Sequence, residues 1–171
     1  MPILLPHNNP SLIKFCQLSN VPSQTTRLAQ LLELRPTLVN SPETDQLNAV
    51  LNLSDYVFQQ ACRFPEWVDE WANMESAVLL TMSPKQVLPI SQAELFELDE
   101  KSLMSRLRLF RHQWMCRLIY LDLLQKIDLK DLTKILSELA DVCVQTSLSW
   151  LKNNYQNLYG DALDSDGELV S

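Results

Sequence analysis

The feature of this sequence most suited to binding chemistry is a cluster of five cations in one short stretch. Its members are Lys101, Arg106, Arg108, Arg111 and Arg117. No acid lies between Lys101 and Asp122, although the 171 residues carry 14 Lys and Arg against 21 Asp and Glu, a formal charge of -7. Planar guanidinium groups bind carboxylates and phosphates through paired hydrogen bonds, a task that suits arginine better than lysine. We take the four arginines as candidate contacts for a partner or another domain.

The alternative is that these arginines are structural. At about 100° per residue, Arg106 and Arg117 fall on nearly the same side of a helix, about three turns apart. Arg111 borders the opposite edge of the apolar stripe formed by Leu107 and Trp114. Because the arginines border a strongly apolar stripe, we favour salt bridges to Asp and Glu of neighbouring helices over ligand contact.

The other residues capable of chemistry predict neither a catalytic nor a metal site. His7 and His112 stand far apart, and the four cysteines include no C-x-x-C pair, so no ligand set has metal-binding spacing. The only glycines are Gly160 and Gly167, which excludes a glycine-rich phosphate loop within these residues. We expect no catalytic residue, no cofactor-binding residue and no metal ligand in this chain.

Composition predicts a folded cytoplasmic protein. Hydrophobic residues make up 46% and charged residues 20% of the chain, which is ordinary globular usage. The negative charge disfavours nucleic acid and anionic lipid as partners. No apolar run approaches a membrane span, the opening residues do not resemble a signal peptide, and the four scattered cysteines are expected to be reduced.

The helix-breaking residues predict how the chain is organised. All nine prolines lie at or before Pro89, and residues 90–159 contain neither proline nor glycine. We expect a proline-rich arm over residues 1–22, a helical domain over 23–159 and an acidic tail or linker over 160–171. No stretch alternates as a strand would, so the predicted fold class is all-α, an irregular bundle of about six to eight helices.

Local signals place the expected helices. Four short ones are predicted between Pro22 and Pro36, after a cap at Ser41 and Pro42, from a cap at Ser54 to about Arg63, and from Pro65 onward. After a loop over residues 83–89, Ser91 and Glu94 form a capping box, a long helix follows over about 99–126, and a second runs from a cap at Asp128 to Gly160. The four tryptophans are predicted to be core residues, and Leu151 and Leu158 are expected to continue the buried stripe of the last helix.

Three segments of this sequence form an ordered set of motifs. The run from Leu107 to Leu118, L-R-L-F-R-H-Q-W-M-C-R-L, is similar to the L-R-x-F-R-x-x-x-M-x-R-I segment of the glutamine-synthetase adenylyltransferase family. Upstream, L-S-D-Y-V at 53–57 and F-P-E-W-V at 64–68 resemble its S-D-F-V and P-E-W-L segments, in the same order. The similarity covers about residues 48–159. It departs at Tyr56, Val68, His112 and Leu118, and His112 is the least conservative of these changes.

The resemblance implies a role without chemistry of its own. In that family the helical segment precedes a nucleotidyltransferase domain with a G-K-L-G-G turn and an S-D-I-D metal-binding pair, which removes adenylyl groups by phosphorolysis. Neither motif occurs in these 171 residues. The chain is therefore expected to be a fragment or truncated relative, an N-terminal helical scaffold in the regulation of nitrogen assimilation.

The resemblance also implies partners and cofactors. The implied partners are the family's nucleotidyltransferase domain, glutamine synthetase and, through the complete enzyme, a PII-type signal protein. Magnesium and ATP or ADP are implied for the complete enzyme, and no cofactor for this chain. The alternative is a free-standing helical interaction protein that binds glutamine synthetase or a signalling partner.

Overall fold

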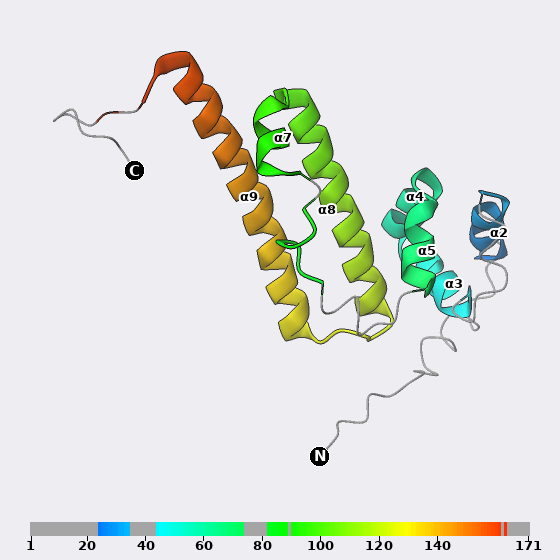
Figure 1. Ribbon diagram of the computed structural model, residues 1–171. Coiled ribbons are helices and arrows are strands. Elements are labelled where there is room, and N and C mark those ends of the chain that lie inside the picture. The colour runs from blue at the N-terminus through cyan, green and yellow to red at the C-terminus, as the bar shows by residue number, and fades with distance from the viewer. Residues whose placement is uncertain (1–23, 35–43, 74–81, 89, 162, 164–171) are drawn as a thin grey trace. The chain divides into compact units, whose positions relative to one another are not determined.

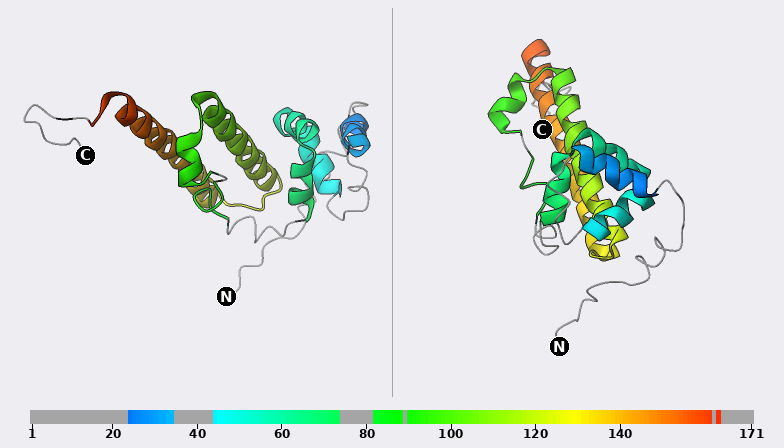
Figure 2. Two further views of the ribbon diagram at one scale, coloured as in Figure 1. Left: turned by 45° about the horizontal axis from the view of Figure 1, so that its top comes forward. Right: turned by 90° about the vertical axis from the view of Figure 1, so that its right-hand side faces the viewer.

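The computed structural model describes residues 24–34, 44–73, 82–88, 90–161 and 163. Within this part of the chain all regular elements are helices (Figure 1), which confirms the all-α prediction. They are α2 (Gln24–Leu34), α3 (Thr44–Leu53), α4 (Asp55–Arg63), α5 (Glu66–Asn73), α7 (Gln92–Glu97), α8 (Glu100–Leu123) and α9 (Leu129–Tyr159). The two long helices expected in the C-terminal half are α8 and α9, both continuous in the views of Figure 2.

Side-chain caps start several helices where the sequence predicts them. The Oγ of Ser54 accepts a hydrogen bond from the Val57 amide at 3.2 Å, and the Oγ of Ser91 accepts one from the Glu94 amide at 3.2 Å. The amide of Asp131 donates to Asp128 Oδ1 at 2.7 Å, which caps α9. Each cap satisfies an amide that has no partner inside its helix. The predicted cap at Ser41 and Pro42 lies outside the described residues.

Both long helices end in left-handed residues. Gly160, with φ 80°, follows α9, and its amide donates to the Gln156 carbonyl at 2.9 Å, as the sequence predicts for a glycine stop. Helix α8 ends at Leu123, short of the predicted residue 126, because Gln125 turns the chain with φ 53°. There the amides of Gln125 and Lys126 donate to the carbonyls of Asp122 and Leu121 at 2.9 and 2.8 Å. This paired pattern is a Schellman motif built on a residue other than glycine.

The chain forms two compact units. Unit 1 comprises residues 1–82 and 112–133, and unit 2 comprises residues 83–111 and 134–171. Helices α8 and α9 each contribute to both units. The predicted arm, helical domain and tail stay predictions, because the arm and most of the tail lie outside the described residues.

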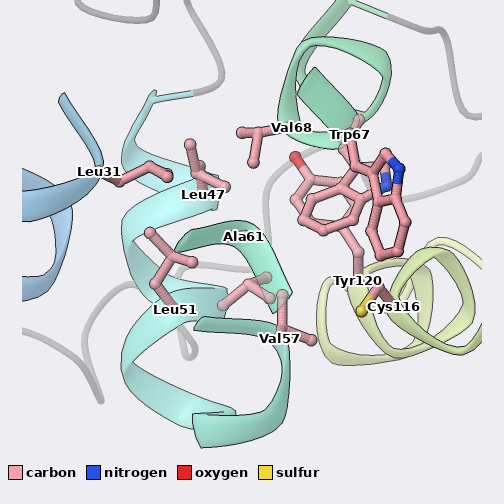
Figure 3. Close-up of a cluster of buried hydrophobic side chains, with 11 residues drawn as sticks. Leu31, Leu47, Leu51, Val57, Ala61, Trp67, Val68, Cys116 and Tyr120 are labelled. Atoms are coloured by element: carbon pink, nitrogen blue, oxygen red, sulfur yellow. The ribbon is translucent and has the colours of Figure 1, made fainter. Parts of the chain in front are cut away.

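The core of unit 1 gathers side chains from five helices (Figure 3). The figure labels Leu31 of α2, Leu47 and Leu51 of α3, Val57 and Ala61 of α4, Trp67 and Val68 of α5, and Cys116 and Tyr120 of α8. Within α3, α4 and α8 these residues recur at steps of four, so they share one buried face of each helix. Arg27 of α2 joins this packing: its guanidinium donates to the Leu51 carbonyl at 2.8 Å and pairs with Asp55 at 2.5 Å.

Unit 2 has its own smaller core. It contains Ile90, Leu95 of α7, Leu103 and Leu107 of α8, and Trp150 of α9. The indole of Trp150 donates to the Leu98 carbonyl at 2.8 Å, which satisfies its one polar atom. Ser83 donates to Glu138 at 2.8 Å and so ties the loop before α7 to α9.

Predicted burial is confirmed for all four tryptophans and wrong for two leucines. Trp67, Trp71, Trp114 and Trp150 are all buried. Leu151 and Leu158 are 43% and 71% exposed. The buried face of α9 passes through Ile135, Leu139, Val142, Thr146 and Trp150. At about 100° per residue both leucines point well away from that face.

Candidate functional site: the arginines of helix α8

Arg117 is buried in unit 1 and pairs with a carboxylate of another helix. Its guanidinium forms an ion pair with Glu70 of α5, and only 4% of its side chain is exposed. Gln113 donates to the second oxygen of the same carboxylate at 3.3 Å. The guanidinium also lies over the Trp114 ring, 4.4 Å from its centroid. These contacts join α5 to α8.

The electrostatics of this pair make Arg117 a structural residue. Burial lowers the pKa of the Arg117 guanidinium, and the Glu70 carboxylate partly offsets that effect. An arginine stays protonated near neutral pH even so, so a full charge is held inside unit 1 and depends on its carboxylate. Since almost none of its surface is accessible, Arg117 cannot also meet a partner protein.

Arg106 is also paired, in unit 2. Its Nη1 lies 2.5 Å from Oε1 of Glu94, the residue whose amide is capped by Ser91. This contact links α7 to α8. Both side chains are about 40% exposed, so the pair contributes on the order of 0.5 kcal/mol to stability. Arg106 and Arg117 thus both form the interhelix pairs that the structural interpretation predicts, while contact of Arg106 with a partner stays a prediction.

Arg108 and Arg111 differ from these two. Both are exposed, and neither forms an ion pair or hydrogen bond within the described residues. With Lys101 they follow one side of α8 at steps of seven and three residues, with the 43% exposed Met104 between them. We call Lys101, Arg108 and Arg111 the basic strip. All three lie in unit 2, and their contact with a partner stays a prediction.

The described cysteines are not activated nucleophiles. Cys62, Cys116 and Cys143 are free thiols. Burial raises the pKa of each of them, that of Cys116 to about 12, and the charge of Arg111 partly offsets the effect at Cys143. Thiols of raised pKa are poor nucleophiles and poor metal ligands near neutral pH. The described residues also hold no group of three or more His, Cys, Asp and Glu side chains able to bind a metal ion.

One contact between side chains could not be predicted from the sequence. The hydroxyl of Tyr56 in α4 lies 2.6 Å from Nδ1 of His112 in α8, with the two ring centroids 5.9 Å apart. Tyr56 stands where the S-D-F-V segment has phenylalanine, and a phenylalanine there would have no hydroxyl to offer to His112. The two residues are 56 positions apart, so no local sequence pattern indicates that they are in contact.

The fold and the candidate site together describe a helical segment. Two of its candidate arginines form ion pairs between helices, and the other two are exposed. Comparison with known proteins is more specific: the sequence profile described as glutamate-ammonia ligase adenylyltransferase matches residues 44–169. The chain therefore belongs to the glutamate-ammonia ligase adenylyltransferase family, as the resemblance predicted. The match includes α3 and every later helix.

Individual relatives agree with this family. The bifunctional glutamine synthetase adenylyltransferase/adenylyl-removing enzyme of Shewanella loihica is 30% identical over 125 residues, which are 73% of this chain and 13% of the relative. The enzyme of the same name from Shewanella frigidimarina is 27% identical over 146 residues, 82% of this chain and 15% of the relative. The chain thus spans about a seventh of the length of these relatives. No solved structure matches it significantly. None of the described helices is long and apolar enough to cross a membrane.

Proposed function

We propose that this chain acts as a helical scaffold of a bifunctional glutamine synthetase adenylyltransferase/adenylyl-removing enzyme in the regulation of nitrogen assimilation. In this role it packs against the nucleotidyltransferase domain of the family polypeptide and helps to form the surface that meets glutamine synthetase in the cytoplasm. The observation that carries the proposal is the family match across residues 44–169, in which the described cations are structural or surface groups.

The basic strip is the proposed contact with glutamine synthetase. Its cations are exposed on a chain whose formal charge is -7, so it would recognise a carboxylate-rich surface rather than an apolar one. Guanidinium groups can engage carboxylates through two parallel hydrogen bonds. Exposed ion pairs contribute about 0.2–1 kcal/mol each, so losing both arginines should weaken binding by between about twofold and about thirtyfold.

Catalysis is proposed to lie elsewhere in the family polypeptide. Magnesium and ATP or ADP would be bound by its nucleotidyltransferase domain, and a PII-type signal protein would act through the complete enzyme. A direct test incubates this chain with adenylylated glutamine synthetase, phosphate and magnesium. We expect no ADP; its formation at enzyme-like rates would contradict the scaffold role.

Binding is tested by immobilising glutamine synthetase, adenylylated or unmodified, and titrating this chain by biolayer interferometry. We expect the Arg108→Ala/Arg111→Ala variant to bind several-fold more weakly than the parent chain. The matched control is Lys130→Ala/Lys134→Ala, which removes two exposed cations outside the strip. Equal affinity of the two variants would show that the strip makes no specific contact.

A second candidate is a free-standing interaction protein that binds glutamine synthetase or a signalling partner. The observation in its favour is that each unit has its own buried cluster, so the chain has the means to fold without further domains. The gene sequence after codon 171 separates the candidates. Continuation into a glycine-rich turn and paired aspartates supports the scaffold, whereas a stop codon supports the independent protein.

A further inference from the structure

Helix α9 carries a second line of apolar side chains, which are open to solvent. They are Val144, Leu148, Leu151, Tyr155 and Leu158, with exposed fractions between 43% and 71%. We call these five residues the outer stripe. They follow one another at steps of four, three, four and three residues, so they keep to one side of the helix over two heptads. All five belong to unit 2.

The outer stripe lies roughly opposite the buried face of the same helix. At about 100° per residue its members fall within about 40° of one line, while Val142, Thr146 and Trp150 lie about 120° or more from that line. Helix α9 (yellow to orange-red in Figure 1) is therefore apolar on two sides over its C-terminal half. A soluble surface helix ordinarily has one apolar side, and a helix apolar on two sides is covered on both.

The continuity of this surface, more than its size, calls for a partner. From their exposed fractions, the five side chains present on the order of 500 Å² to solvent, comparable to the largest apolar patch of a typical monomer. Tyr159 extends the patch: it is 78% exposed, and its ring stacks on that of Tyr155 with centroids 5.7 Å apart. Scattered surface leucines need no explanation, but a continuous line of this length does.

The near absence of charged residues along this part of α9 indicates what kind of surface the outer stripe can bind. Between Val142 and Gly160 the only charged residue is Lys152, beside the stripe. An anionic lipid surface would require several cations there. A second copy packed antiparallel about Leu151 would bring the two Lys152 ammonium groups close together, and like charges repel at such positions. The near absence of charge therefore fits an apolar protein surface, and a second copy of this chain is an outcome that the test below distinguishes.

We propose that the outer stripe docks an apolar helix of the family's own polypeptide, from the part outside the matched segment. The four-and-three spacing suits knobs-into-holes packing, which requires a helix on the other side. The profile match extends through residue 169, so the whole of α9 lies within the segment that matches the family. In the Shewanella relatives the matched segment is 13% to 15% of the polypeptide, so ample chain remains to supply that helix. This inference rests on the proposed scaffold role and names the surface that it uses.

The test uses a chimera of the Shewanella loihica enzyme in which this chain replaces the matched segment. The stripe variant is Leu148→Lys/Tyr155→Lys. The matched control is Gln145→Lys/Ser149→Lys, which adds the same two charges to exposed positions of the same helix outside the stripe. Thermal unfolding and limited proteolysis are measured for each chimera. Each isolated chain is also examined by circular dichroism and light scattering.

In the isolated chain we expect parent, stripe variant and control to have the same helicity and melting temperature, since the exchanged side chains are exposed. In the chimera the stripe variant should be cleaved about tenfold faster and melt lower than the control, because lysines would be buried in the seam. Equal behaviour of the two chimeras would overturn the proposal. So would a strongly destabilised stripe variant of the isolated chain, or a parent dimer that the stripe variant dissociates.

Failure of this inference is separable from failure of the proposed function. The Arg108→Ala/Arg111→Ala chimera alters none of the stripe residues and reports on binding of glutamine synthetase. If its binding is weakened while the stripe chimera behaves like its control, the basic strip stands and the outer stripe is refuted.

Discussion

Removing Glu70 should destabilise the protein more than removing the arginine with which it pairs. Arg117 is 4% exposed and Glu70 is 20% exposed, so the two charges depend on each other unequally. In Glu70→Ala the guanidinium remains inside unit 1 without a carboxylate. In Arg117→Met the remaining carboxylate can hydrate at its open edge and still accepts from Gln113.

The magnitudes follow from this difference in exposure. Leaving a buried charge without its partner costs about 3–5 kcal/mol, so we expect Glu70→Ala to lower the free energy of unfolding by about 3 kcal/mol. Arg117→Met keeps much of the apolar volume that covers Trp114 and should cost about 1–2 kcal/mol. The double variant lacks both charges, so no buried charge is left without a partner, and its stability should resemble that of Arg117→Met. The coupling between the sites is then about 3 kcal/mol, the whole of the Glu70→Ala loss.

Urea unfolding followed by tryptophan fluorescence provides the assay, because Trp67, Trp71 and Trp114 all belong to unit 1. All four members of the double-mutant cycle are measured at one pH and one salt concentration. Glu70→Gln serves as a control that keeps side-chain volume while removing the charge. A coupling below about 0.5 kcal/mol, or a larger loss for Arg117→Met than for Glu70→Ala, would refute the reasoning.

Three further predictions concern backbone and titration. Gln125→Gly should raise the free energy of unfolding by about 0.5–1 kcal/mol in urea melts, because glycine adopts the φ of 53° without steric cost; a loss of stability would contradict this. Ser54→Ala removes the cap of α4 and should cost about 1 kcal/mol, whereas Ser105→Ala, on the exposed side of α8, should change stability little. Burial raises the pKa of Cys116 from 9.0 to about 12, so its contribution to stability is complete below pH 9 and lost as the pH rises through about 12. Between about pH 8 and about pH 11 the parent should therefore lose more stability than Cys116→Ala, and parallel losses would show that the thiol does not contribute.

The helices could be predicted from the sequence because their signals are local. Ser54, Ser91 and Asp128 cap amides three positions ahead, and Gly160 stops the helix immediately before it. The end of α8 could not be predicted in the same way. Gln125 adopts a conformation that most side chains disfavour, and nothing in its residue type indicates this.

The burial of a side chain could be predicted only where its helix has a single apolar side, which then faces the core. Periodicity shows which residues share a side of a helix, but not how many sides are covered within the chain. Leu151 and Leu158 were predicted to be buried because they continue an apolar pattern, yet they belong to a separate line that faces solvent. An apolar stripe thus has the same sequence signature whether its partner lies inside the described chain or outside it.

Residue type and spacing identified the four arginines as a candidate site. They could not show which of the four form ion pairs within the chain and which do not. Arg106 and Arg117 share nearly one side of α8, yet their acids come from different helices, Glu94 of α7 and Glu70 of α5, in different units. An arginine of α8 therefore forms an internal ion pair where a neighbouring helix offers a carboxylate, and the side of α8 on which it lies matters less. Within the described residues no carboxylate reaches Arg108 or Arg111, which is why the proposed contact with glutamine synthetase uses those two guanidinium groups.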